Sequence, residues 1–173
     1  LVEVWNQVLA AAVSAERVFE VLDTVPNVQD KPGAVALPRV KGHVVFKDVT
    51  FGYDPNLPVL HNVNIEAREN ETIALVGPTG AGKSSVINLL CRFYDVQGGQ
   101  VLIDGYDVRD VTVQSLRENL GIVLQDTVIF SGTIRDNIRY GRLDATDEEV
   151  EAAAAIVGAH EFISQLPDGY DTQ

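Results

Sequence analysis

The sequence has few of the features that mark disulfide-bonded, nucleic-acid-binding or secreted proteins. Its single cysteine, Cys91, excludes a disulfide within the chain and a cluster of zinc-bound thiolates, which suits a reducing compartment. It has no basic run and a formal net charge of -12, so we expect no nucleic acid among its partners. No stretch is long and apolar enough to span a bilayer. Residues 1–13 lack the basic start of a signal peptide.

The length of 173 residues and the hydrophobic fraction of 46% suffice for one domain with its own core. Apolar residues recur at helical spacing near the start, at Trp5, Val8, Ala12, Ala15, Phe19 and Leu22. No N-cap signal precedes them, so we expect a helix over 1–23 that begins inside a longer one. Prolines and a glycine then break the pattern over 24–42, which predicts an extended linker before the compact domain.

Beyond the linker, strand and helix patterns alternate. Strands at 43–53 and 59–66, joined by a proline-containing turn, predict an antiparallel subsheet. Short apolar runs at 72–76 and 122–124 fit buried strands, and another strand is expected at 101–104. Helices are expected at 82–94, 112–119 and 159–166, and two more begin with capping boxes, at Thr133 with Asp136 and at Thr146 with Glu149. This order predicts an α/β fold.

One segment carries a specific chemical signature. The run Gly77-Pro78-Thr79-Gly80-Ala81-Gly82-Lys83-Ser84 matches G-x-x-x-x-G-K-[ST] between an expected strand and an expected helix. Glycines let the backbone approach phosphates closely, consecutive N–H groups form an anion nest, and the following helix adds its positive dipole end. The signature predicts a P-loop that binds the phosphates of a nucleoside triphosphate, ATP. The alternative is a plain glycine-rich turn between a strand and a helix.

Three side chains at the end of this loop have expected roles. The Lys83 ammonium is expected to reach the β- and γ-phosphates, and the Ser84 hydroxyl to coordinate Mg²⁺. Ser85 is expected to add a phosphate contact. Other chemistry-bearing residues have ordinary interpretations: Cys91 as a buried apolar side chain, the acidic residues 144–151 as a solvated helix start, and the three histidines as surface or capping residues without metal-ligand spacing.

Further motifs accompany the P-loop in a fixed order. Phe51-Gly52-Tyr53 precedes it, and Val123-Leu124-Gln125-Asp126 and the run from Ile129 to Ile138 follow it. With these motifs the chain resembles the nucleotide-binding domain of an ATP-binding cassette (ABC) exporter almost throughout. The resemblance implies a P-loop NTPase fold of ABC type, incomplete, with a mixed sheet, an antiparallel β subsheet and an N-terminal helix.

The resemblance also divides the chain and implies partners. Residues 1–23, with Ser14 to Asp23, resemble the exit from the last transmembrane helix, 24–42 a linker, and 43–173 the first part of the nucleotide-binding domain. The implied parent is an integral membrane protein with this domain on the cytoplasmic face of the cell membrane. The implied partners are ATP, Mg²⁺, a transmembrane domain and a second nucleotide-binding domain, identical or different. The cargo is not encoded in these residues.

Two further site residues are assigned by the resemblance alone. Tyr53 corresponds to the aromatic residue that stacks on adenine, and without the P-loop it would equally well be a core tyrosine at a strand end. Gln125 corresponds to the glutamine that contacts Mg²⁺ and the attacking water, in a loop that faces the membrane domain. A lone glutamine is otherwise an ordinary solvated residue.

Three motifs of the family do not occur in the printed residues: the Leu-Ser-Gly-Gly-Gln-type signature, the Asp-Glu after an apolar strand, and the switch histidine. The Asp would hold Mg²⁺ through water, and the Glu would act as general base. We therefore expect ATP binding without appreciable hydrolysis, and an exposed apolar face and sheet edge that favour aggregation. Two alternatives remain: a nucleotide-binding module without transport function, such as a regulatory domain or an ABC-type protein acting on nucleic acid or ribosomes, and an inactive gene fragment.

Overall fold

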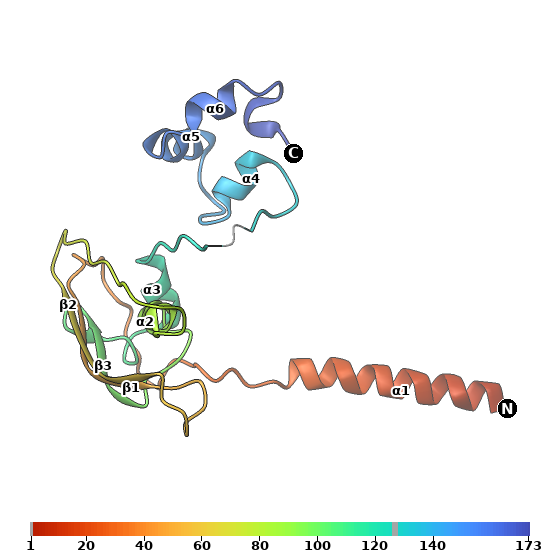
Figure 1. The fold of residues 1–173 in the computed structure, drawn as a ribbon. Coiled ribbons are helices and arrows are strands. Elements are labelled where there is room, and N and C mark those ends of the chain that lie inside the picture. Colours follow the sequence, from red (N-terminus) through yellow and green to blue (C-terminus); the bar gives the residue numbers. More distant parts are fainter. Residues whose placement is uncertain (1, 126–127) are drawn as a thin grey trace. The chain divides into compact units, whose positions relative to one another are not determined.

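The computed structural model describes residues 2–125 and 128–173, with side chains from residue 12 onward. Leu1, the side chains of Trp5 and Val8, and Asp126 therefore lie outside the described part. The chain forms two compact units, residues 1–122 and 123–173, which are described separately below. Figure 1 shows the course of the chain and the labels of its helices and strands.

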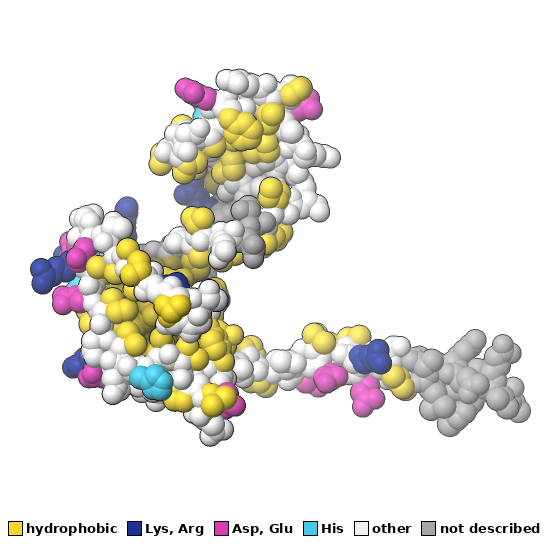
Figure 2. Space-filling view, in the orientation of Figure 1, with side chains coloured by type: hydrophobic (Ala, Val, Ile, Leu, Met, Phe, Trp, Pro, Cys, Tyr) yellow, Lys and Arg dark blue, Asp and Glu magenta, His cyan; other side chains and the backbone are white. Residues whose placement is uncertain are grey.

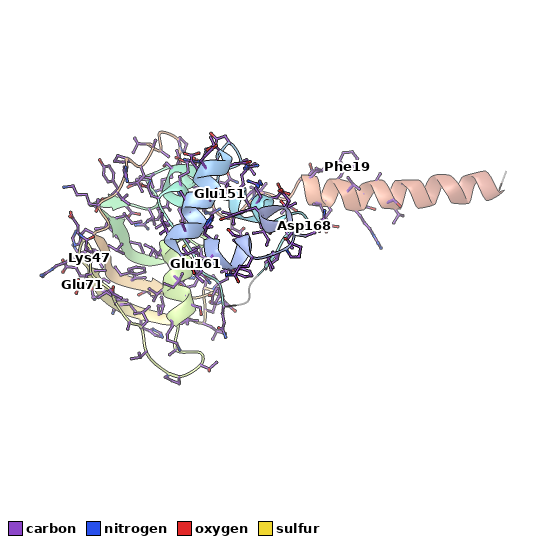
Figure 3. All side chains as sticks on the ribbon, turned by 90° about the horizontal axis from the view of Figure 1, so that it is seen from above. Phe19, Lys47, Glu71, Glu151, Glu161 and Asp168 are labelled. Carbon is purple, nitrogen blue, oxygen red and sulfur yellow. The ribbon has the colours of Figure 1, made fainter. Side chains whose placement is uncertain are left out.

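The first helix has the length that the sequence predicts. α1 spans Val2–Leu22, and its last turn ends in a hydrogen bond from the Thr24 hydroxyl to the Glu20 carbonyl oxygen at 2.7 Å. Its described apolar side chains are uncovered: Phe19 is 59% exposed and projects from α1 in Figure 3, and Leu22 is 71% exposed.

The segment after α1 is only partly a free linker. Leu37 is buried in the core of the first unit, and its N–H donates to the Ser115 hydroxyl at 2.8 Å. Val35 forms a parallel bridge with Val111. Further upstream, the buried Arg92 donates to the Gln29 carbonyl oxygen at 2.9 Å. The second half of the expected linker therefore packs on the domain, because its apolar residues find partners there.

An antiparallel sheet forms one layer of the first unit. Its strands are β1 (Val44–Phe51), β2 (Leu60–Ala67), β3 (Gly98–Ile103) and β4 (Tyr106–Asp107), in the spatial order β2-β1-β3-β4. A register shift between Phe46 and Val49 keeps both side chains buried although they are three residues apart. The predicted antiparallel subsheet is thereby confirmed.

Two helices pack against one face of this sheet. α2 (Lys83–Leu90) and α3 (Val113–Glu118) lie on one side of the sheet (Figure 1). They contribute Val86, Leu89 and Leu116 to a core that also contains residues of β1, β2 and β3. Thr112 caps α3 by accepting from the Ser115 N–H. The predicted helices here are confirmed, although α2 ends at Leu90 rather than near Tyr94.

Two predicted strands do not form in the described residues. Residues 72–76 and 122–124 have irregular backbone, and Val76 and Val123 are 90% and 99% exposed. A buried parallel strand needs neighbouring strands on both sides, and these runs find none in the described part of the chain. Figure 2 shows hydrophobic side chains gathered on the face of the first unit that it displays, whereas Lys47 and Glu71 project outward in Figure 3.

The second unit is a small helical cluster. It contains α4 (Ile134–Arg139), α5 (Asp147–Ile156), α6 (His160–Ser164) and a 3-10 turn, η1 (Gly169–Asp171), around a core of Val150, Ala154, Ile163 and Tyr170. Both predicted capping boxes are present, at Thr133 with Asp136 and at Thr146 with Glu149. The last helix is shorter than predicted, because it ends at Ser164 before the turn at Pro167.

Candidate nucleotide site

The backbone of the P-loop is neither extended nor helical. Gly80 and Gly82 both have left-handed dihedrals, with φ values of 85° and 82°, on either side of Ala81. The Ala81 N–H donates to the Pro78 carbonyl oxygen at 3.2 Å and closes a turn. Such alternation of left-handed and other residues turns successive N–H groups toward one side, which is the geometry of an anion nest.

Gly82 joins this loop to α2 with a left-handed backbone that favours glycine. It is the N-cap of the eight-residue helix α2, and its carbonyl oxygen accepts from the Val86 N–H at 3.1 Å. A Cβ at this position would lie 2.6 Å from Cδ2 of Leu60 in β2. The dihedrals of Gly82 therefore favour glycine, and any larger residue would also have to displace the end of the Leu60 side chain.

The Lys83 side chain folds back over the loop. Its Nζ donates to the carbonyl oxygens of Gly77 and Pro78, both at 2.8 Å. The ammonium therefore lies against the loop's first residues while the helix N-terminus, with its unpaired N–H groups, follows directly. A cation held beside N–H donors in this way favours an anionic ligand.

The two serines that follow Lys83 differ in their surroundings. Ser84 is exposed, as a hydroxyl that contacts a ligand must be, whereas Ser85 is only 4% exposed. The Ser85 hydroxyl lies 3.1 Å from the phenolic oxygen of Tyr53. The expected phosphate contact of Ser85 stays a prediction, because in this structure its hydroxyl is shared with Tyr53.

Tyr53 lies in an aromatic cluster beside the P-loop helix. Its ring meets the rings of Phe51 and Tyr94 edge to face, at centroid distances of 5.1 Å each. Tyr53 is nevertheless 52% exposed, so part of the ring is available for stacking. The structure thus brings the predicted Tyr53, Ser85 and P-loop helix together.

Asn88 belongs to this group, although the sequence analysis missed it. Its Nδ2 donates to the Tyr53 phenolic oxygen at 3.2 Å. Asn88 follows Ser85 by three residues, so both lie on one face of α2. In the sequence, only this spacing of three residues could have pointed to Asn88. It does not indicate a role unless Tyr53 is known to face α2.

Burial also changes the chemistry of Cys91, the residue directly after α2. Cys91 is 2% exposed, and burial raises the pKa of its thiol, while the nearby Arg117 guanidinium works in the opposite direction. A thiol with a raised pKa is a poor nucleophile at neutral pH. This confirms the interpretation of Cys91 as a buried apolar side chain.

Gln125 belongs to the second unit, whereas the P-loop belongs to the first. Gln125 is exposed, and its approach to Ser84 and Mg²⁺ stays a prediction. Downstream of it, the Asn137 side chain holds the backbone of Phe130, accepting from its N–H at 2.8 Å and donating to its carbonyl oxygen at 3.0 Å. The Phe130 ring stacks on Tyr140 at 4.2 Å. The motif from Ile129 to Ile138 therefore consists of a loop, tied to α4 by Asn137, and most of α4 itself.

The fold agrees with a comparison to known proteins. A family model described as ABC transporter matches residues 60–172, which is more than half of the chain. This chain belongs to the ABC transporter family. The matched residues include β2, the whole P-loop, α2 and the motifs after it, whereas β1 lies before the matched range.

Two curated relatives show the level of similarity. The chain is 52% identical over 168 residues to an uncharacterised ABC transporter ATP-binding protein, YfiC, of Bacillus subtilis (strain 168), and this covers 97% of the chain and 28% of that protein. It is 45% identical over 172 residues to an ATP-dependent lipid A-core flippase of Syntrophus aciditrophicus (strain SB), covering 99% of the chain and 28% of the flippase. The chain thus spans less than a third of the length of these relatives.

A solved structure shows the same fold. A bacterial Atm1-family ABC exporter with ATP bound matches the chain with a TM-score of 0.88 and 44% sequence identity, over 97% of this chain and 29% of that one. The chain is therefore an ATP-binding domain portion of exporter type. Among residues 2–125 and 128–173, no helix combines the length and the apolar character needed to cross a membrane.

Proposed function

We propose that this chain binds Mg·ATP through residues 77–85, with Tyr53 under the adenine base. The observation that carries the proposal is the loop backbone, in which Gly80 and Gly82 take left-handed dihedrals directly before α2. ATP binding is the common property of the family to which the chain belongs, and the Atm1-family exporter that it matches contains bound ATP.

The residues present fit a triphosphate. The loop between Gly77 and Gly82 carries only small side chains, so N–H groups rather than bulky groups line the turn. Lys83 now donates to two carbonyl oxygens of the loop, and phosphate oxygens would be stronger acceptors because they are charged. Binding would thus exchange two neutral acceptors for anionic ones without moving α2.

Ser84 and Gln125 are the residues that would hold the metal. Hydroxyl and amide oxygens are hard ligands of the kind that Mg²⁺ accepts, together with phosphate oxygens and water. When bound, Mg²⁺ neutralises the charge that develops on the phosphate oxygens. The exposed Ser84 hydroxyl on the first turn of α2 needs no rearrangement of the helix to serve as such a ligand.

In the whole protein we propose that ATP binding joins two such domains and that hydrolysis separates them, which resets the attached membrane domains. Water would attack the γ-phosphate in line, with Lys83, Ser84 and Gln125 contributed by this portion. The printed residues include no general base in the position that the family uses, so we expect them to bind ATP without hydrolysing it. α1 would be the cytosolic end of a membrane-spanning helix on the cytoplasmic side.

Titration calorimetry with Mg·ATP tests the proposed site. We expect Lys83→Ala to abolish or gravely weaken binding, because it removes the only lysine of the loop. A matched control is Lys47→Ala, since Lys47 projects from the sheet side of the same unit (Figure 3). Unchanged affinity in the Lys83 variant would refute the site.

A further inference from the structure

Gln97 makes an unusual pair of hydrogen bonds to the residue before Tyr53. Its side-chain amide accepts from the Gly52 N–H at 2.8 Å and donates to the Gly52 carbonyl oxygen at 2.8 Å. The Gln97 N–H donates in turn to the Thr50 carbonyl oxygen at 3.1 Å. Gln97 thereby extends the pairing of β3 with β1 by one residue. Its side-chain amide makes the two bonds to Gly52 that a backbone peptide group of β3 would otherwise make.

Gly52 lies just beyond the end of β1, where a side-chain amide can bond to both of its backbone groups. β1 ends at Phe51, and the turn after Tyr53 brings the backbone of Leu57 against Gly52. A Cβ on Gly52 would lie 2.5 Å from the Leu57 carbonyl oxygen and 2.7 Å from that of Asp54. A side chain is thus excluded at this position, and Gln97 bonds to the two backbone groups of Gly52 instead.

The two Gln97 bonds fix the backbone from which the Tyr53 side chain departs. The ring itself is held at its edges by Phe51 and Tyr94, and its hydroxyl by Ser85 and Asn88. Without Gln97, the N–H and carbonyl oxygen of Gly52 would lose these two bonds, and the bond from the Val59 N–H to the Phe51 carbonyl oxygen at 2.7 Å would remain to hold the preceding peptide group. Glycine has the widest choice of dihedrals, so we expect the backbone at Gly52 to gain freedom. Stacking on a base requires one ring orientation, so such freedom would reduce it.

We propose that Gln97 is a positioning residue for Tyr53 and thereby sets the affinity for the purine base of ATP, as distinct from its phosphates. This inference rests on the proposed function. The hydrogen bonds of Gln97 among the described residues go to Gly52 and Thr50, so we infer that it acts through Gly52 and Tyr53. The pair of bonds to Gly52 needs both a donor and an acceptor on the side chain. A glutamate only accepts at neutral pH, so it could replace the bond from the Gly52 N–H but not the bond to the Gly52 carbonyl oxygen.

The test compares Mg·ATP with Mg·tripolyphosphate, which has the phosphates but no base, by titration calorimetry on this chain. We expect Gln97→Ala to raise the Kd for Mg·ATP about 5-fold or more, within the range that loss of base stacking covers. The Kd for Mg·tripolyphosphate should not change. Gln97→Glu should fall between the wild type and Gln97→Ala. Gln100→Ala is the matched control, because Gln100 lies on β3 and bonds to Asp107 instead.

A double mutant separates positioning from general destabilisation. With Tyr53→Ala already present, Gln97→Ala should have no further effect on the Kd for Mg·ATP. A further loss in that background, equal losses for both ligands, or an unchanged Kd for Mg·ATP in Gln97→Ala would overturn the inference. If the wild-type chain itself does not bind Mg·ATP, the proposed function fails first, and this outcome is recognised from the wild type alone.

Discussion

The phenolic oxygen of Tyr53 lies 3.1 Å from the hydroxyl oxygen of Ser85, the third residue of α2. The residue proposed to carry the base is thus hydrogen-bonded to the helix whose N-terminus is proposed to hold the phosphates. Asn88 adds a second bond from the same helix at 3.2 Å. The group that contacts the base and the group that contacts the phosphates would therefore be held at a fixed position relative to each other.

Tyr53 variants separate the ring from its hydroxyl. Tyr53→Ala should weaken Mg·ATP binding by about 1–3 kcal/mol, because it removes the stacking surface. Tyr53→Phe keeps the ring but loses both bonds to α2, so it should cost less than Tyr53→Ala and more than nothing. Calorimetric Kd values for Mg·ATP measure both effects.

Tyr140→Ala is the control for this pair, since Tyr140 is an exposed aromatic residue that stacks on Phe130 in the second unit. It should leave the Kd unchanged. A Tyr53→Ala variant that binds Mg·ATP as tightly as the wild type would remove the adenine role from Tyr53.

Arg92 holds the incoming segment to the end of the P-loop helix. Only 1% exposed, it donates to Asp95, to the Val111 carbonyl oxygen at 3.0 Å and to the Gln29 carbonyl oxygen at 2.9 Å. Arg92→Ala should lower the free energy of unfolding by about 1–3 kcal/mol, because it takes a donor away from the buried Val111 carbonyl oxygen and removes a buried side chain. Urea denaturation measures this loss.

Hydrogen exchange tests the same role locally. In Arg92→Ala the amides of Val35 and Leu37, which now bond to Asp110 and Ser115, should exchange faster. Arg68→Ala is the control, because Arg68 is 79% exposed and its ion pair with Glu66 is long, at 3.9 Å; it should change stability by no more than about 0.5 kcal/mol. An Arg92 variant as stable as this control would contradict the assigned role.

Asp107 gives the first unit a predicted pH dependence. Burial alone would raise the pKa of Asp107, but hydrogen bonds from Arg109 and Gln100 outweigh it and hold the pKa below its ordinary value of 3.8. The folded state therefore favours the carboxylate. The Asp107 carboxylate should therefore add its full contribution to folding stability above pH 3.8, the ordinary pKa expected in the unfolded chain. This contribution should be lost as the pH falls through the lower pKa of the folded state.

Asp107→Asn should accordingly destabilise the chain by about 1–3 kcal/mol at pH 7, and the difference from the wild type should shrink below pH 3.8. Urea denaturation of both proteins at pH 7 and at a pH below 3.8 measures this difference in stability. Asp110→Asn, whose carboxylate is 64% exposed, should change stability by less than about 1 kcal/mol. A difference that grows toward low pH would have the wrong sign.

Local signals in the sequence predicted the elements that depend on neighbours nearby in the chain. The capping boxes at Thr133 and Thr146, the antiparallel pair β1 and β2, and the helix after the P-loop all formed as expected. Their stability comes from contacts within a few residues or between adjacent strands, which a single sequence displays directly.

The two failed strands depended instead on partners elsewhere. The apolar runs that end at Val76 and Leu124 have the composition of buried strands, but composition cannot supply the hydrogen bonds of a neighbour. Their exposure supports the expectation of aggregation, which stays a prediction. Gln97 and Asn88 were missed for a related reason, since each acts on a residue about 35 to 45 positions away in the sequence.

The central claim is that main-chain amides of residues 77–85, together with the Lys83 ammonium, surround the triphosphate. The most direct measurement is the set of backbone amide NMR shifts during titration with Mg·ATP, with Lys83→Ala as the control. We expect the largest shifts on Gly80, Gly82, Lys83 and Ser84, at one common Kd, and no such shifts in the variant. Saturable shifts elsewhere with these amides unmoved would contradict it.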